Sequence, residues 1–466
     1  MLFSSITFLY YFLPIALLIY FIVPGFLKNT VLLLSSLVFY AWGEPKYVFL
    51  MIGTIAVNYL MGLLIEKFKG KPLSKVFVII SVVFSLGLLG YFKYAGFFAE
   101  NFSRLTGVDM GVFNIALPIG ISFYTFQILS YTVDVYRGTV SAQKNPVTLG
   151  AYITLFPQLI AGPIVRYSDV EKQLSLRIHS FEKASYGIRR FILGLSKKVI
   201  LANTLGELCS TFHTTADKSV LFYWFFAICY MLQVYFDFSG YSDMAIGIGK
   251  ILGFDFNENF RYPFISSSIS EFWRRWHISL GTWFRDYVYI PMGGNRVKRM
   301  RMFVNLFVVW FLTGFWHGAE WNFVVWGLYF AVLLVIEKFF FAQKLKKIGA
   351  LSHVYVLFFT LISFVIFSGS SMTEASSYLR AMFGGAGLPV VSKTFLYQLR
   401  NYGFTVLIAI AASTPFFVKI KEKLSAKKAF SKAFNTLETV YLLLLLVIVT
   451  AYLADGSFNP FLYFRF

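Results

Sequence analysis

Apolar runs separated by short polar and basic stretches follow one another along the whole chain. The longer runs approach the roughly 17 to 25 residues that a transmembrane helix needs, and the shorter ones suit tilted or re-entrant helices. The pattern predicts about eleven full spans plus re-entrant pieces. The expected segments are Phe3–Val23, Val31–Tyr40, Tyr47–Ile65, Val76–Phe92, Leu117–Val135, Leu149–Ile164, Phe191–Leu208, Leu221–Phe238, Met244–Leu252, Phe303–Trp316, Trp321–Ile336, Val354–Phe367, Phe404–Val418 and Val440–Leu453.

The composition agrees with this pattern. Hydrophobic residues make up 58% of the chain and charged residues only 14%, whereas soluble domains are about 25% charged. One large soluble core is therefore excluded, and we expect an all-α polytopic integral membrane protein. Neither an internal repeat nor a low-complexity linker is visible, so residues 1–466 are expected to form a single membrane domain with a C-terminal tail at 455–466.

The net charge of +20 is gathered into clusters between apolar runs. This distribution indicates membrane topology and not nucleic-acid binding, because no basic stripe with stacking aromatic residues is present. The positive-inside rule places the clusters in the cytoplasm, and counting spans outward places the N-terminus and the tail outside the cell membrane. The clusters are Lys67–Lys75, Arg166–Lys198, Arg261–Arg301, Lys338–Lys347 and Lys419–Lys432.

A lone histidine, His317, stands between the apolar runs Phe303–Trp316 and Trp321–Ile336. Ionisable groups at membrane depth are costly, so such a residue is a candidate functional site. The first run would rise roughly 21 Å as a helix, against a hydrocarbon core of roughly 30 Å. His317 is therefore expected beyond the bilayer midplane. The alternative is a structural histidine whose ring bonds to a neighbouring backbone carbonyl.

A second histidine, His277, lies in the stretch Glu271–Tyr287, whose helical periodicity predicts an interfacial helix with a buried aromatic side. His277 belongs to the buried side, and the charged residues lie away from it. Such a histidine alone is more often structural, but its pairing with His317 indicates a shared site. A buried imidazole stays neutral because desolvation disfavours the charged form, and a neutral imidazole can accept a proton from an attacking hydroxyl.

Other ionisable residues receive no catalytic role. Two histidines without further convergent ligands do not predict a metal site. Asp237 and Asp243 are expected to be buried structural acceptors, because they share no helical face with either histidine.

Several motifs resemble the membrane-bound O-acyltransferase (MBOAT) family. The runs that carry the resemblance are Glu271–His277, Trp283–Tyr287 and Phe315–Ala319. Two further runs, Tyr235–Asp243 and Tyr289–Arg296, resemble the bacterial branch of alginate and peptidoglycan O-acetyltransferases. The resemblance implies a ring of helices around a thinned centre, with a tunnel joining a cytoplasmic and an outer funnel.

The same resemblance implies roles for the two histidines. The histidine matching His317 is the catalytic one, and the histidine matching His277 supports it. The related D-alanyl transferases of teichoic-acid synthesis share both histidines but lack the tract Met292–Arg296. The presence of this tract favours acetyl over D-alanyl transfer.

The chain ends in the pattern Phe-x-Tyr-Phe-x-Phe, with Tyr463 as its tyrosine. One interpretation is an aromatic anchor at the outer interface. The pattern also resembles the C-terminal peptide that serves as an acyl-tyrosine relay in the D-alanylation system. A thiol has a pKa near 8.5 and a phenol about 10, so a tyrosyl ester loses little activation relative to a thioester. The anchor and the carrier both stay open for Tyr463.

The combined reading is acetyl transfer across the membrane. We expect acetyl-CoA as the donor substrate, with no bound cofactor, and its phosphates suit the basic residues Arg274, Arg275, Arg285 and Arg296. Those charges would also be present if they served topology alone. The resemblance implies an extracytoplasmic serine-type (SGNH-like) acyltransferase partner that modifies an exported polysaccharide. The alternatives are a D-alanyl transferase, a polysaccharide transporter and a structural scaffold.

Overall fold

The computed structural model describes residues 1–111, 115–425, 431–456 and 459–460, so Tyr463 lies outside the described residues. Every regular element in these ranges is a helix. Six described helices are long and apolar enough to cross a membrane, or seven if the bent pair α19–α20 forms one span. The prediction of an all-α polytopic membrane protein is confirmed, whereas the expected number of about eleven full spans is not.

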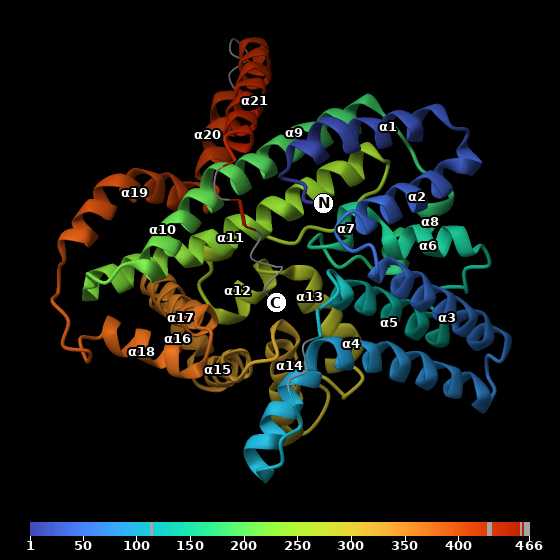
Figure 1. The fold of residues 1–466 in the computed structure, drawn as a ribbon, viewed down its shortest axis with the longest axis horizontal. Helices are drawn as coiled ribbons and strands as arrows, with labels where there is room; N and C mark the ends of the chain where they lie inside the picture. Colours follow the sequence, from blue (N-terminus) through green and yellow to red (C-terminus); the bar gives the residue numbers. More distant parts are fainter. Residues whose placement is uncertain (112–114, 426–430, 457–458, 461–466) are drawn as a thin grey trace. The chain divides into compact units, whose positions relative to one another are not determined.

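The chain divides into two compact units, and each is described by itself. Unit 1 comprises residues 1–191 and 242–257. Within it, α3, α4 and α5 pack against one another, and α2 packs against α6 (Figure 1). Its elements, with η marking π or 3₁₀ turns, are η1 (Phe8–Phe12), α1 (Leu13–Ile22), η2 (Gly25–Leu27), α2 (Lys28–Ala41), α3 (Tyr47–Lys67), α4 (Pro72–Thr106), α5 (Ile121–Arg137), α6 (Pro146–Thr154), α7 (Phe156–Leu159) and α8 (Tyr167–Ser175).

Unit 2 comprises residues 192–241 and 258–466. Two helices, α9 (Phe181–Ser196) and α11 (Val220–Ile251), contribute residues to both units. The other elements of unit 2 are η3 (Lys197–Ala202), α10 (Asn203–Thr214), η4 (Pro263–Ile265), α12 (Ile269–Arg275), α13 (Ile278–Phe284), η5 (Arg285–Tyr289), α14 (Arg299–His317), α15 (Trp321–Ile336), η6 (Glu337–Phe341), α16 (Ala342–Lys347), α17 (Leu351–Ser368), α18 (Met372–Met382), α19 (Lys393–Ala412), α20 (Phe416–Ser425) and α21 (Ser431–Ala454).

Helix α11 is longer than the sequence pattern suggested. The segments expected at Leu221–Phe238 and Met244–Leu252 form one helix of 32 residues. Gly240 lies between them without ending the helix. A Cβ at Gly240 would lie 2.7 Å from the carbonyl oxygen of Gly194, so this glycine serves close packing and not a turn.

The expected continuous helix over Glu271–Tyr287 is wrong. Helix α12 ends at Arg275, and His277 has a left-handed backbone with a φ of 44°. The backbone N–H of Ile278 donates to the carbonyl of Asn259, so it leaves the helical pattern. The predicted burial pattern is nevertheless confirmed, because His277 is buried while Arg274 and Arg285 are exposed.

Helices α14 and α15 form a tight hairpin in unit 2 (Figure 1). A Cβ at Gly327 would lie 2.2 Å from the carbonyl oxygen of Trp310, and one at Gly314 would lie 2.3 Å from that of Phe323. Only glycine at these positions lets the two backbones touch. The hairpin therefore fixes where α14 ends, and its last residue is His317.

Candidate active site

His317 ends α14 inside a cage of aromatic rings. Its imidazole packs edge to face against Trp326 and Phe367, with ring centroids 5.0 and 5.4 Å away. The next residue, Gly318, admits the ring of Phe323, because a Cβ there would lie 2.2 Å from that ring. His317 is 7% exposed, so its ring is held in a nearly dry setting.

His277 is fixed by a network around Asn259. The backbone N–H and the hydroxyl of Ser279 both lie within hydrogen-bond distance of Asn259 Oδ1, at 3.2 and 2.9 Å. A backbone N–H can only donate, so this amide atom must be the oxygen. His277 Nδ1 lies 3.2 Å from the same oxygen and must therefore donate a proton. A neutral His277 then carries its proton on Nδ1, and its Nε2 keeps a lone pair.

Burial keeps His277 neutral. Its side chain is 1% exposed, and this desolvation lowers the pKa of His277 well below the ordinary value. The charge that His317 would carry lowers the pKa of His277 further. Burial and a charge on His317 thus act in the same direction and favour the neutral form of His277.

The structure brings the two predicted histidines together through Trp316. The indole lies 6.1 Å from the His277 ring and 4.9 Å from the His317 ring, measured between centroids. The edge of His277 also packs against Phe238 at 4.6 Å. The two histidines thus share one aromatic environment, although His277 lies in the break between α12 and α13 and His317 ends α14.

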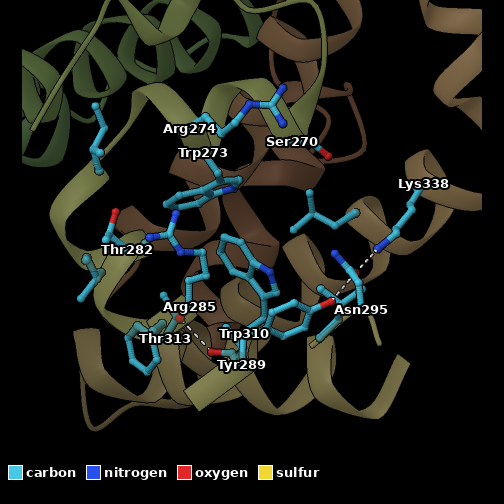
Figure 2. Close-up of a pocket in the computed structure, with 17 residues that line it drawn as sticks. Ser270, Trp273, Arg274, Thr282, Arg285, Tyr289, Asn295, Trp310, Thr313 and Lys338 are labelled. Atoms are coloured by element: carbon cyan, nitrogen blue, oxygen red, sulfur yellow. Dashed lines mark hydrogen bonds between the residues drawn. The ribbon is translucent and has the colours of Figure 1, made fainter. Parts of the chain in front are cut away.

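A basic cavity of about 500 Å³ opens beside this site. Figure 2 shows Arg274, Arg285 and Lys338 around it, together with the indoles of Trp273 and Trp310. No acidic side chain is among the described residues that line it. Thr313, one helical turn before His317, is also part of the wall. We call this space the basic cavity.

The four arginines named from the sequence are placed differently. Arg274 and Arg285 line the basic cavity. Arg275 instead forms a salt bridge of 2.8 Å with Glu271 and donates to the carbonyl of Arg261. Arg296 is exposed and is not among the residues that line the cavity.

Sequence reasoning missed two polar residues of the basic cavity. Asn295 Oδ1 accepts hydrogen bonds from Lys338 Nζ at 2.7 Å and from the hydroxyl of Tyr289 at 2.8 Å (Figure 2). From the sequence, Lys338 was counted only among the basic clusters that set the membrane topology. Asn295 could have been found, because it lies in the tract Met292–Arg296, one of the runs that carry the family resemblance.

A second cavity, of about 560 Å³, lies in the same unit. Its wall contains Glu320, Glu374, Gln233 and His213, and no lysine or arginine is among its described lining residues. His213, which received no role from the sequence, lies 3.1 Å from the hydroxyl of Tyr378 through its Nδ1. We call this space the acidic cavity.

The two cavities lie toward opposite ends of α15. Leu334 lines the basic cavity and Phe323 lines the acidic cavity, which are about 16 Å apart along the helix. Residues Trp321–Phe341 form one of the candidate membrane spans. Neither His277 nor His317 is among the lining residues of the two cavities. Phe367, which packs on His317, is part of the acidic wall.

Both aspartates expected as buried structural acceptors accept ion pairs, but only one of them is buried. Asp237 is buried and pairs with the buried Lys198 at 2.7 Å, whereas Asp243 is half-buried and pairs with Arg190 at 2.8 Å. Both cysteines, Cys209 and Cys229, are buried and free.

Residues 140–375 match the model of the MBOAT, membrane-bound O-acyltransferase family. Similar proteins include the probable alginate O-acetylase AlgI of Azotobacter vinelandii, which is 38% identical over the whole of both chains. The peptidoglycan O-acetyltransferase of Helicobacter pylori is 32% identical over 100% of this chain and 98% of its own. The teichoic acid D-alanyltransferase of Bacillus subtilis is 31% identical over 55% of this chain and 70% of its own. With its buried pair of histidines and its membrane helices, the chain belongs to the membrane-bound O-acyltransferase family.

Proposed function

We propose that this O-acyltransferase passes an acetyl group from cytoplasmic acetyl-CoA across the cell membrane, for O-acetylation of an exported polysaccharide or cell-wall glycan. The observation that carries the proposal is the pair of cavities of opposite charge toward the two ends of α15. His317 follows Thr313 of the basic cavity by one helical turn and packs against Phe367 of the acidic cavity. A donor and an acceptor could then approach one imidazole from two sides.

The basic cavity suits the donor. Arg274, Arg285 and Lys338 supply three cations around it, and guanidinium groups bind phosphate oxygens in a bidentate way. The indoles of Trp273 and Trp310 add apolar surface to the same lining. An acyl-CoA combines phosphates with an uncharged acylated arm, and the lining offers cations for the first and apolar surface for the second.

The tract Met292–Arg296 supports acetyl over D-alanyl transfer. Asn305 Nδ2 donates to the carbonyls of Met292 and Gly294, which fixes the tract against α14. Asn295 then reaches the basic cavity and pairs with Lys338. The feature that separates the acetyl branch from the D-alanyl branch thus contributes to the cavity proposed for the donor.

In the chemical step, His317 acts as the general base toward an accepting hydroxyl. An imidazole nitrogen takes the hydroxyl proton as the oxygen attacks the acetyl carbon, and an acetyl–oxygen bond replaces the acetyl–sulfur bond. The proton then passes to the thiolate, which leaves as the free thiol. His277, with its lone pair on Nε2, either orients the thioester or takes part in this proton transfer.

Tyr463 is the proposed first acceptor. It lies three residues beyond Pro460, which lines the acidic cavity, and three extended residues span about 10 Å. The acetyl group would pass from the tyrosyl ester to an extracytoplasmic SGNH-like acyltransferase and then to the glycan. This scheme requires the tail to be extracytoplasmic, the side on which the positive-inside rule also places the N-terminus.

The test is release of free CoA thiol by the purified protein in membrane vesicles supplied with acetyl-CoA. Replacing the base by His317→Ala should lower the rate by about a hundredfold to ten-thousandfold. An unchanged rate would remove His317 from the chemistry. A transporter or scaffold would release no thiol at all. Tyr463→Phe should abolish glycan acetylation if Tyr463 is a carrier and spare it if Tyr463 is an anchor.

A further inference from the structure

Lys198 is a buried lysine in the π-helical turn η3. Its side chain is 2% exposed, and its Nζ lies 2.7 Å from Oδ1 of Asp237, whose side chain is 3% exposed. A lone buried ammonium is strongly unfavourable, so a charge at this depth requires an opposite charge and further hydrogen bonds. The pair accounts for a lysine inside an otherwise apolar segment.

A close backbone contact sets the position of this pair. Gly240 follows Asp237 by about one turn of α11, and a Cβ there would lie 3.1 Å from the backbone nitrogen of Lys198. The missing side chain lets η3 touch α11. Single π turns of this kind often occur at functional positions.

The same ammonium reaches the C-terminal tail. Lys198 Nζ donates to Asn203 Oδ1 at 2.9 Å and to the backbone carbonyl of Pro460. Asn203 Nδ2 donates in turn to Asn459 Oδ1 at 3.1 Å. The ammonium of Lys198 therefore has two hydrogen-bond acceptors, on Asn203 and Pro460, in addition to its ion pair with Asp237.

We propose that Lys198, Asp237 and Asn203 form a docking site for the tail of this same chain. Its ligands are the backbone carbonyl of Pro460 and the side-chain amide of Asn459. Docking supplies a buried cation with one of its acceptors, and this favours the docked tail because an unmet charged donor is costly in the interior. The three are positioning residues and do not touch the reacting atoms.

The location of the site gives docking a consequence. Pro460 lines the acidic cavity, whose wall also contains Phe367 against the His317 ring. Helix α21, which precedes the tail, packs against η3, the turn that carries Lys198. This consequence rests on the proposed function, since it presents Tyr463 to the acidic cavity as the acyl acceptor. The docking itself does not depend on any acyl transfer.

The test measures docking without acetyl-CoA, in the full-length chain in native membranes. The two buried cysteines are replaced by alanine, and the probes are Ser210→Cys and Pro460→Cys, two positions that line the acidic cavity. The replacement at 460 keeps the backbone carbonyl that Lys198 binds and leaves Asn459 intact. A protease site is inserted between residues 425 and 431. A short bis-maleimide then keeps the two fragments together on a denaturing gel after cleavage only when position 460 lies at the cavity.

Removing both charges at once with Lys198→Met and Asp237→Leu avoids leaving one charge buried alone. Loss of one charge-assisted hydrogen bond corresponds to about a tenfold fall in the docked-to-undocked ratio, read as cross-linking efficiency. Lys197→Met, the half-buried neighbour on the same turn, is the matched control and should cross-link as the parent does.

A third variant covers the case in which the double replacement fails to fold. Asn203→Leu keeps the ion pair, removes the Asn203–Asn459 bond and one acceptor of Lys198, and should also lower cross-linking. If well-folded chains cross-link equally with and without these residues, the docking site is wrong. Acetylation measured on the same variants is a separate readout. If the Lys198 variant loses cross-linking but acetylates as the parent does, the tail has no part in the reaction, and the docking site itself is still supported.

Discussion

The two cavities of unit 2 have similar volumes but opposite chemistry. The basic cavity, about 500 Å³, carries Arg274, Arg285 and Lys338, whereas the acidic cavity, about 560 Å³, carries Glu320 and Glu374. A phosphate-bearing ligand is attracted by the first and repelled by the second. This difference in charge is the basis on which we propose that donor and acceptor bind at opposite ends of α15.

The hairpin α14–α15 contributes to both cavities, since Trp310 and Thr313 line the basic cavity and Phe323 lines the acidic cavity. Trp326 and Phe367 pack edge to face against the ring of His317 at the end of α14. We call these rings around His317 the partition, and we expect the reactivity of His317 to depend on their packing. The following predictions address the partition, the cavity walls and the neutral state of His277.

The largest effect is expected from Phe367→Ala, which removes a ring from the partition. Phe367 is buried and contacts both His317 and Phe323. Loss of a buried Phe side chain costs about 3–5 kcal/mol of the free energy of unfolding. Thermal denaturation in detergent measures the change. Phe358→Ala, on the exposed side of the same helix, is the control, and an equal loss there would show that Phe367 has no special place.

The combined variant Arg274→Gln with Arg285→Gln tests the basic wall. Arg285 is largely exposed and already paired with Asp286, so its contribution is reduced by solvent. We expect the KM for acetyl-CoA to rise by roughly tenfold to a hundredfold for the pair, with little change in kcat. Steady-state thiol release measures both constants.

Two control variants accompany this measurement. Arg296→Gln lies off the cavity and should leave the KM unchanged. Glu374→Gln alters the acidic wall and should also leave it unchanged. A larger rise in KM for Glu374→Gln than for the arginine pair would reverse the assignment of the two cavities.

A smaller loss is expected when the hairpin is forced apart by Gly327→Ala. The new Cβ would lie 2.2 Å from the backbone carbonyl of Trp310, which cannot rotate away. Such overpacking costs about 1–3 kcal/mol of the free energy of unfolding. Gly87→Ala, also helical but with nothing within 4 Å of its Cβ, should be neutral or slightly stabilising. Chemical denaturation compares the two, and equal behaviour would contradict the close contact.

The smallest effect concerns pH. Burial lowers the pKa of His277 below its ordinary value of about 6.5. At a pH between the lowered pKa of folded His277 and 6.5, the unfolded chain binds more protons at this residue than the folded chain does. The free energy of unfolding is therefore unaffected by His277 above pH 6.5 and falls as the pH is lowered below 6.5. The slope is at most about 1.4 kcal/mol per pH unit.

The pH measurement compares melting curves from pH 7.5 to 5.5 for the parent and for His277→Gln, which should lose less stability on acidification. The pKa of His179 is also lowered, mainly by burial, so only the difference between the two proteins reports on His277. Parallel curves would mean that His277 is not held neutral by the fold.

Several features could be predicted from local pattern. The apolar runs indicated α3, α15, α17 and α21, because each presents a long hydrophobic stretch with charges at its ends. The buried side of Glu271–Tyr287 was also correct. The break at His277 could not be foreseen, because the acceptors that capture Ile278 and Ser279 come from Asn259, eighteen residues before His277.

Among the site residues, the sequence selected the two histidines, since an isolated ionisable group between apolar runs is conspicuous. It could not separate Arg274 and Arg285 from Arg275 and Arg296, because all four share the same charge and neighbourhood in the chain. Their different partners decide their placement, and Glu271 removes Arg275 from the cavity.

By itself, the order of amino acids determined a helical membrane protein with two buried histidines, since hydropathy and the rarity of charge act along the chain. Only the tertiary structure decided which cations line a cavity, that Lys198 meets both Asp237 and the tail, and that two cavities of opposite charge lie at the ends of one helix. These relations join residues far apart in sequence, and their energies depend on burial and distance, which a linear pattern does not contain.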